Sequence, residues 1–337
     1  MMIELSELRD AAQKAFPVGA ASLGRDAAWQ TISELGWLLI ELPEDLGGLG
    51  LGADAAATIH FELGRVLSPA PLLPALLGLR AIAAADQFAA RQEWIDRICA
   101  GEYVPAPLLP ANLSVQDGRI SGTISGVAEA DMASHVVIAM PGLCQLIALD
   151  DPAVTVTERP LWDESRRLFD VVLTGYAVAA DLTLATGEAA DAFAQSLESQ
   201  ALLALAADSL GGASTALDLT VEYLKVRKQF DRPLAMFQAL KHRCADLKTA
   251  VVAGEALLWD RAGSGAATLA ELGALKAHAA EVFAAVCEES IQLHGGIGLT
   301  SEHPCHTYMK RAQLNLHLCG SADRWYELAG RTALGAV

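Results

Sequence analysis

The first third of the chain carries the hydrophobic spacing of α-helices. Apolar residues recur every three or four positions in residues 4–16 and 27–40, which is the period of a helix with one buried face. The glycine-rich stretch PEDLGGLGLGAD at 43–54 interrupts this pattern, and helical spacing then resumes. Gly101 is the expected C-cap of the last helix in this part. We therefore predict an N-terminal helical domain over residues 1–104.

The spacing changes in residues 105–183. Short runs rich in β-branched residues, such as HVVIAM, AVTVT and RLFDVVL, are separated by Gly, Pro and Asp. Runs of this length with such boundaries are typical of strands joined by tight turns. The pattern predicts a small antiparallel sheet or barrel over these residues.

Helical spacing returns in residues 184–337. Long antiparallel helices with short connections form a bundle. The predicted fold class of the whole chain is α+β and mostly α: an N-terminal helical domain, a small β domain and a C-terminal four-helix bundle. The bundle helices are expected at 187–229, with an interruption at Gly211-Gly212, and at 234–262, 267–293 and 303–332.

Composition and charge narrow the class of protein. The formal net charge of −17 disfavours binding to nucleic-acid phosphates. The start MMIELSELRD lacks the basic and apolar regions of a signal peptide, and no apolar run reaches the roughly 18 residues of a membrane span. The cysteines form no CxxC pair and are expected to be free thiols. We therefore expect a cytoplasmic protein with no membrane span.

Two segments of the predicted bundle could bind a phosphate. Arg227 and Gln229 lie at the expected end of one helix, Pro233 is expected to open the next, and Gln238 lies in its first turns, where free N–H groups favour anions. The stretch IQLHGGIGLT at 291–300 has glycines that would let a ligand approach the backbone. On spacing alone, a plain helix corner with a surface arginine and a plain glycine turn are the favoured explanations.

Taken together, the motifs resemble the acyl-CoA dehydrogenase family of flavoproteins over nearly the whole length. GWLLIELPEDLGGLGLG resembles the N-terminal segment of the family, and LWDESRRLFDVVLTG resembles a segment late in its middle domain. The patterns Y...R.QF..PL..FQ...H..AD and Q..GGIG.T.E resemble its two C-terminal signatures. The architecture of the family has the same order of helices, strands and bundle.

The resemblance implies an FAD site shared across a subunit interface, to which each subunit contributes its bundle residues. Asp231 departs from the family, which usually has glycine after Gln-Phe, and an acid near a phosphate is unfavourable. By the resemblance, Arg227 would bind the pyrophosphate and Phe230 would pack beside the flavin nucleotide. Gln292, Gly295 and Gly296 would contact the ADP portion. Gln229 and Gln238 complete the set of cofactor-binding residues.

The resemblance does not supply a catalytic base. Members of the family abstract the α-proton of an acyl-CoA with a glutamate, placed either before a Gly-Thr near the C-terminus or on the first bundle helix. Cys319 and Ala201 occupy these positions here, and we assign no catalytic residue. Glu198, three residues from Ala201, is the substitute that the sequence offers.

Compared with the family, the middle domain is also shortened and lacks the two segments that usually contact the flavin ring. VPAPLLPANLSV has no Thr-Glu-Pro loop, and GTISGVAEAD has no aromatic–Ile-Thr segment. This combination, with the EHPCHTYMKRA stretch, resembles the short degenerate subunit of bacterial heterotetrameric steroid side-chain acyl-CoA dehydrogenases. The resemblance implies an α2β2 complex with a full-length subunit, an acyl-CoA substrate and an electron-transfer flavoprotein-type acceptor. An active homo-oligomer using Glu198 and a flavin-free acyl-CoA-binding scaffold remain alternatives.

Three further features have competing explanations. His303, Cys305 and His306 are too closely spaced for a structural zinc site, so we expect no metal. His242 is expected to be a packing histidine. The Arg166-Arg167 pair is expected at a solvated edge of the β domain rather than at a CoA phosphate.

Overall fold

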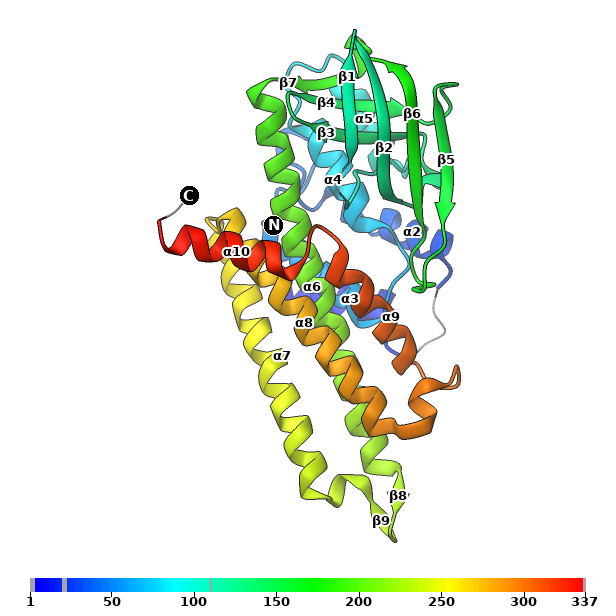
Figure 1. The fold of residues 1–337 in the computed structure, drawn as a ribbon, viewed down its shortest axis with the longest axis vertical. Coiled ribbons are helices and arrows are strands. Elements are labelled where there is room, and N and C mark those ends of the chain that lie inside the picture. The colour runs from blue at the N-terminus through cyan, green and yellow to red at the C-terminus, as the bar shows by residue number, and fades with distance from the viewer. Residues whose placement is uncertain (1–3, 20–22, 110, 336–337) are drawn as a thin grey trace. The chain divides into compact units, whose positions relative to one another are not determined.

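The computed structural model describes residues 4–19, 23–109 and 111–335 (Figure 1). The α-helices in these residues are α1 (Leu5–Ala15), α2 (Arg25–Glu34), α3 (Ala53–Arg65), α4 (Leu72–Ala83), α5 (Arg91–Cys99), α6 (Glu188–Val226), α7 (Gln238–Ser264), α8 (Leu269–His294), α9 (Cys305–His317) and α10 (Ala322–Ala333). The strands are β1 (Asn112–Gln116), β2 (Arg119–Ala128), β3 (His135–Met140), β4 (Leu143–Ala148), β5 (Val154–Arg159), β6 (Leu168–Ala177), β7 (Thr183–Thr186), β8 (Lys228–Gln229) and β9 (Arg232–Pro233).

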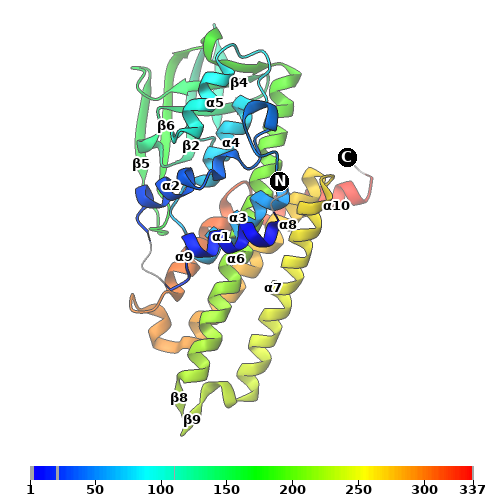
Figure 2. The same ribbon diagram turned by 180° about the vertical axis from the view of Figure 1, so that it is seen from behind.

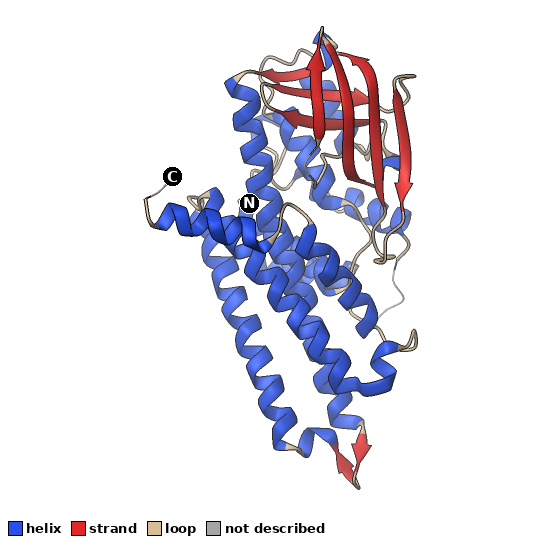
Figure 3. Cartoon of the chain, in the orientation of Figure 1, coloured by secondary structure: helices blue, strands red, loops and turns tan. Residues whose placement is uncertain are grey.

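The predicted order of helices, strands and long helices is confirmed, as Figure 3 shows. The chain folds into two compact units. One comprises residues 1–22, 53–68 and 202–337, which we call the bundle unit, and the other comprises residues 23–52 and 69–201, which we call the sheet unit. The continuous helix α6 (Figure 2) contributes to both units. The domain boundaries at 104/105 and 183/184 remain predictions.

The sheet unit contains two antiparallel sheets. One has the strand order β1-β2-β6-β5 and the other β3-β4-β7. Their inward side chains form one apolar cluster, to which β2 contributes Ile120 and Ile124 and β4 contributes Leu143 and Ile147. Alternating inward residues bury the apolar face of each sheet, which is the arrangement that the β-branched runs predict.

Gln145 is the exception in this apolar cluster. It lies between Leu143 and Ile147 on the same face of β4, pairs with Ile138 of β3 and has no exposed surface. Neither its amide nitrogen nor its amide oxygen has a hydrogen-bond partner. Burying a polar group without a partner costs roughly 1–3 kcal/mol.

Replacing Gln145 with methionine should therefore raise the free energy of unfolding by about 1–2 kcal/mol, because the apolar side chain has similar volume and no polar atoms to satisfy. Urea unfolding monitored by circular dichroism measures this change. Gln116→Met, at an exposed position of β1, is the matched control and should change stability little. A less stable Gln145→Met protein would mean that buried water satisfies the glutamine.

The bundle unit corrects two predicted helix limits. Gly211 and Gly212 do not interrupt α6, which continues through them. Both glycines lie against neighbouring chain where a side chain would clash, so close packing explains why glycine stands there. The predicted helix 303–332 is instead two helices, α9 and α10. The chain turns between them, where Cys319 and Gly320 have φ values of 53° and 95° that a helix cannot continue through.

Helix α6 bears on the expectation that the protein has no membrane span. It is long and apolar enough to cross one, but 83% of its most apolar 18-residue window is buried inside the protein. A helix whose apolar surface already contacts protein has little left to present to lipid, so the apolar composition of α6 is that of a core helix.

Candidate functional site

The corner between α6 and α7 positions the first group of candidate cofactor residues. Helix α6 ends at Val226, and Arg227 follows with its N–H donating to Tyr223 O at 2.9 Å. The two-residue strands β8 and β9 form a hairpin, and Leu234 N donates to Arg227 O at 2.8 Å. Pro233 opens a short 3-10 turn at 234–236 rather than α7, which begins at Gln238. The predicted helix end near Arg227 is thus confirmed. The expectation that Pro233 opens the next long helix is wrong.

The tip of this hairpin is a strained turn. Phe230 and Asp231 have φ values of 52° and 59°, in the left-handed region. Asp tolerates this region better than most residues, which explains how it can stand where glycine is usual. An aromatic residue there is an outlier that costs roughly 1–3 kcal/mol. Phe230 is 84% exposed, and its ring lies beside the Phe237 ring with centroids 6.0 Å apart. Burial within the described chain therefore does little to offset the strain.

The second group lies at the end of α8. Gly295 caps this helix with φ 65° and ψ −142°, a conformation that favours glycine. A Cβ added at Gly295 or Gly296 would meet nothing within 4 Å. These two glycines are therefore not needed for packing inside the described chain, in contrast to Gly211. Their open backbone faces the surrounding space.

A contact that the sequence did not suggest brings the two groups together. The Tyr223 ring stacks on the His294 ring with centroids 4.3 Å apart, and Tyr223 Oη donates to His294 O at 3.3 Å. Tyr223 lies one turn before Arg227, and His294 directly precedes Gly295. The signal was available, because Tyr223 is the first residue of one signature and His294 lies inside the other.

All the candidate cofactor residues are exposed to solvent, as are apolar side chains beside them. Val226 is 73% exposed and Leu299 is 74% exposed. Such apolar exposure on a charged surface is typical of an interaction site. The exposed candidates are Arg227, Gln229, Phe230, Gln238, Gln292, Gly295 and Gly296.

His294 also belongs to a cluster with the half-buried His303 and the buried Cys305, in which one ligand atom of each residue lies within 4.8 Å of the others. However, His294 Nδ1 lies 2.7 Å from Ser290 O, and Cys305 Sγ is nearer to this nitrogen (3.4 Å) than to Nε2 (3.8 Å). The backbone N–H of Cys305 donates to His303 Nδ1 at 3.3 Å. These contacts describe two packed, hydrogen-bonded histidine rings tilted at 46° to each other, and the absence of a metal remains a prediction.

The two usual base positions differ in environment. Cys319 lies at the turn between α9 and α10, where its carbonyl accepts a hydrogen bond from Trp325 Nε1 at 2.8 Å. Nearby, the buried Lys276 ammonium donates to Gly320 O at 2.9 Å, and burial lowers the pKa of Lys276 to about 8. Ala201 is buried in α6, and Glu198 is half-buried on the same helix. The structure thus places Cys319 in a packed corner and leaves Glu198 untested as a base.

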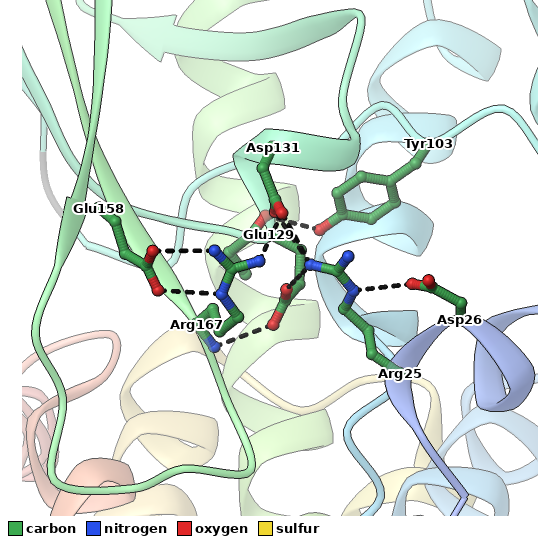
Figure 4. Close-up of polar contacts among 8 residues, drawn as sticks. Arg25, Asp26, Tyr103, Glu129, Asp131, Glu158 and Arg167 are labelled. Carbon is green, nitrogen blue, oxygen red and sulfur yellow. Dashed lines mark hydrogen bonds and ion pairs between the residues drawn. The ribbon is translucent and has the colours of Figure 1, made fainter.

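The segment GTISGVAEAD ends in an ion-pair network in the sheet unit (Figure 4). Glu129, which is 2% exposed, accepts from Arg25 Nη1 at 2.9 Å and from the backbone N–H of Arg167 at 2.9 Å. Asp131 also accepts from both arginines. The preceding carbonyl, Ala128 O, accepts from Tyr103 Oη at 2.8 Å.

Electrostatics within this network differ between its two carboxyl groups. Burial raises the pKa of Glu129 despite the hydrogen bonds from Arg25 and Arg167. Burial also opposes ionisation of Asp131, but hydrogen bonds from the two arginines outweigh it and lower the pKa of Asp131. The Arg167 guanidinium further binds Glu158 with two hydrogen bonds of 2.9 Å. Arg167 is therefore engaged by carboxylates rather than presented to a phosphate.

Comparisons with known proteins identify the family to which the chain belongs. A family model for the N-terminal domain of acyl-CoA dehydrogenases matches residues 6–102, and one for the C-terminal domain matches residues 194–334. The chain therefore belongs to the acyl-CoA dehydrogenase family, whose cofactor is FAD. Within the described residues, the helices, sheets and long helices follow the same order as the matched domains.

Individual relatives refine the placement. The chain is 40% identical over 166 residues to acyl-CoA dehydrogenase IpdE2 of Mycolicibacterium smegmatis, an alignment that covers 49% of each protein, so the match spans about half the length of that relative. The structure of a variant of the Tcur3481-Tcur3483 steroid ACAD matches with TM-score 0.86 and 28% identity over 98% of both chains. The ChsE4-ChsE5 complex from Mycobacterium tuberculosis matches in fold, with TM-score 0.84, 23% identity and coverage of 99% and 98%.

Proposed function

We propose that this chain is a non-catalytic subunit of a hetero-oligomeric, FAD-dependent acyl-CoA dehydrogenase. The complex would carry out α,β-dehydrogenation of a CoA thioester, with a steroid side-chain acyl group as the expected substrate. The chain would contribute its exposed bundle residues to an FAD site completed by a full-length partner subunit. The observation that carries this proposal is the strained, 84% exposed Phe230 beside Arg227.

The residues present fit half of an FAD site. Arg227 can bind a pyrophosphate through two parallel hydrogen bonds, and the N–H groups at the start of α7 near Gln238 favour an anion. The open backbone at Gly295 and Gly296 leaves room for the ADP portion, since an added Cβ meets nothing there. Gln229 and Gln292 can supply amide hydrogen bonds. When bound, FAD would accept the β-hydride of the acyl group.

The sheet unit supports the absence of a flavin-ring pocket in this chain. Its segment 122–131, GTISGVAEAD, lacks the aromatic–Ile-Thr pattern whose groups contact the flavin ring in the family. Glu129 is tied to Arg25 and Arg167. The flanking segment 104–115, apart from Pro110, which lies outside the described residues, has no hydroxyl-bearing loop of the family type.

The relatives support the substrate class and the partner. One matched structure is a steroid ACAD with two named components, and another is a complex of two named chains. We extend this to an α2β2 assembly in the cytoplasm, with an electron-transfer flavoprotein-type acceptor. The exposed apolar side chains Val226, Phe230 and Leu299 would be covered by the partner.

The test uses the chain co-expressed with the product of the adjacent gene. Arg227→Ala should lower the FAD content of the purified complex at least about tenfold, because a charge-assisted bidentate contact contributes roughly 1.5–3 kcal/mol. The visible flavin absorbance per mole of complex measures this loss. Arg331→Ala, which removes an arginine paired within α10, is the control.

Two outcomes would overturn the proposal. If Arg227→Ala leaves the flavin content of an intact complex unchanged, Arg227 does not bind FAD. If the chain purified alone carries stoichiometric flavin and oxidises an acyl-CoA, it is an active homo-oligomer. Glu198→Gln would then show whether Glu198 is its base, since loss of turnover would assign that role.

A further inference from the structure

The sheet unit contains a partly open cavity of about 250 Å³ between the 37–43 segment and helix α4. Its wall is mostly apolar, with Leu38 and Leu42 on one side and Leu76 and Leu79 on the other. Two ionisable side chains, Glu41 and Arg80, also line it. A mostly apolar cavity with a few polar groups is the usual form of a small-molecule site. The cavity lies entirely within the sheet unit, whereas the candidate cofactor residues belong to the bundle unit.

The carboxylate of Glu41 is only half satisfied by the protein. Gln200 Nε2 of α6 donates to Glu41 Oε1 at 3.2 Å, and Arg80 Nη1 lies 3.6 Å from the same oxygen. Within the described residues, Glu41 Oε2 accepts no hydrogen bond. The side chain is 17% exposed, and burial raises its pKa although Arg80 and Gln200 lower it. An acceptor oxygen is thus available on a largely buried side chain.

We propose that this cavity binds a small alicyclic hydrocarbon group that carries one hydroxyl, whose O–H donates to Glu41 Oε2. The leucine side chains would cover the hydrocarbon, and the volume suits a single ring with its substituents. A ligand carboxylate would be repelled by Glu41. A ligand ammonium would need desolvation beside the Arg80 guanidinium, which already supplies a positive charge. A neutral hydroxyl satisfies Oε2 without adding charge to an apolar wall.

The hydroxylated ring could be a free alcohol or the acyl end of a CoA thioester. Hydroxyl recognition by Glu41 does not depend on FAD binding, because the two sites use different residues. The thioester source alone rests on the proposed function. Failure of this proposal would therefore leave the FAD half-site untouched, and failure of the Arg227 experiment would leave the cavity untouched.

The experiment measures binding of cyclohexanol to the full chain by ligand-observed NMR, with methylcyclohexane as the probe that lacks the hydroxyl. We expect saturable binding of cyclohexanol, and binding about tenfold weaker for methylcyclohexane or for the Glu41→Leu variant. Ala83→Phe, which fills the cavity without removing the carboxylate, should abolish binding of both probes. Glu44→Gln, an exposed acid on the same segment, is the control and should bind as the wild type does.

A second arm uses 4-hydroxycyclohexanecarboxyl-CoA and its analogue without the hydroxyl. If the thioester needs Glu41 in the same way, the acyl end is the natural form of the ligand, and if only cyclohexanol does, a free alcohol is. Circular dichroism melting of each variant confirms that it is folded. The proposal is overturned if neither hydroxylated probe binds the wild type, or if folded Glu41→Leu binds both with unchanged affinity.

Discussion

Replacing Asp208 with leucine should lower the free energy of unfolding by about 3–5 kcal/mol, the cost of leaving a buried charge without its counter-ion. Asp208 on α6 is 5% exposed, and Arg311 on α9 has no exposed surface. Arg311 Nη1 lies 3.2 Å from Asp208 Oδ1, and Asn315 Nδ2 donates to Oδ2 at 2.8 Å. The leucine would remove the carboxylate that both groups bind while keeping a similar volume, although Arg311 keeps its hydrogen bond to Ser68 O and Asn315 keeps its bond to Ser209 Oγ.

A urea titration followed by tryptophan fluorescence measures this loss. Glu327→Ala is the matched control, because it breaks the pair with Arg331 in which both side chains are 63% exposed. Exposed pairs contribute only about 0–1 kcal/mol, so the control should unfold almost as the wild type does. The double variant Asp208→Leu with Arg311→Met should recover much of the stability, because no charge then remains buried. A loss below about 1 kcal/mol for Asp208→Leu would mean that water reaches Arg311.

The same residues show what the sequence could and could not predict. Hydrophobic spacing identified the helices around Asp208 and Arg311, because that period depends only on neighbours in the chain. Their pairing joins positions 103 residues apart, and no local pattern encodes it. Asp208 carries no sequence motif, whereas in the structure it holds Arg311.

The candidate site divides in the same way. The sequence predicted the two groups of cofactor residues around Arg227 and Gly295, because each group lies within one short signature. Their connection through Tyr223 and His294 was not, since it depends on how α6 packs against α8. The break at Cys319 was missed because the flanking residues continue helical spacing, and only the backbone dihedral angles reveal the turn. Glu41 carried no motif and became a candidate only through the cavity that it lines.

Gly211→Ala should lower the free energy of unfolding by about 3 kcal/mol, although alanine is the better helix former. A Cβ at Gly211 would lie 2.0 Å from Phe61 O of α3, and one at Gly64 would lie 2.2 Å from Asp208 O of α6. The two glycines thus let the backbones of α3 and α6 touch at one crossing. Backbone atoms have no rotamers with which to move aside, so the helices must separate and expose part of the surface that they bury.

Gly330→Ala in α10 is the matched control, because its added Cβ meets nothing within 4 Å and its φ is helical. There the exchange should raise stability by about 0.5–1 kcal/mol, the ordinary preference of a helix for alanine. Thermal unfolding of both variants by calorimetry should therefore shift in opposite directions. If Gly211→Ala shifted upward with Gly330→Ala, the crossing would be loose enough to admit a methyl group. Gly211 would then act through helix propensity alone, and the pair with Gly64 would not set the distance between α3 and α6.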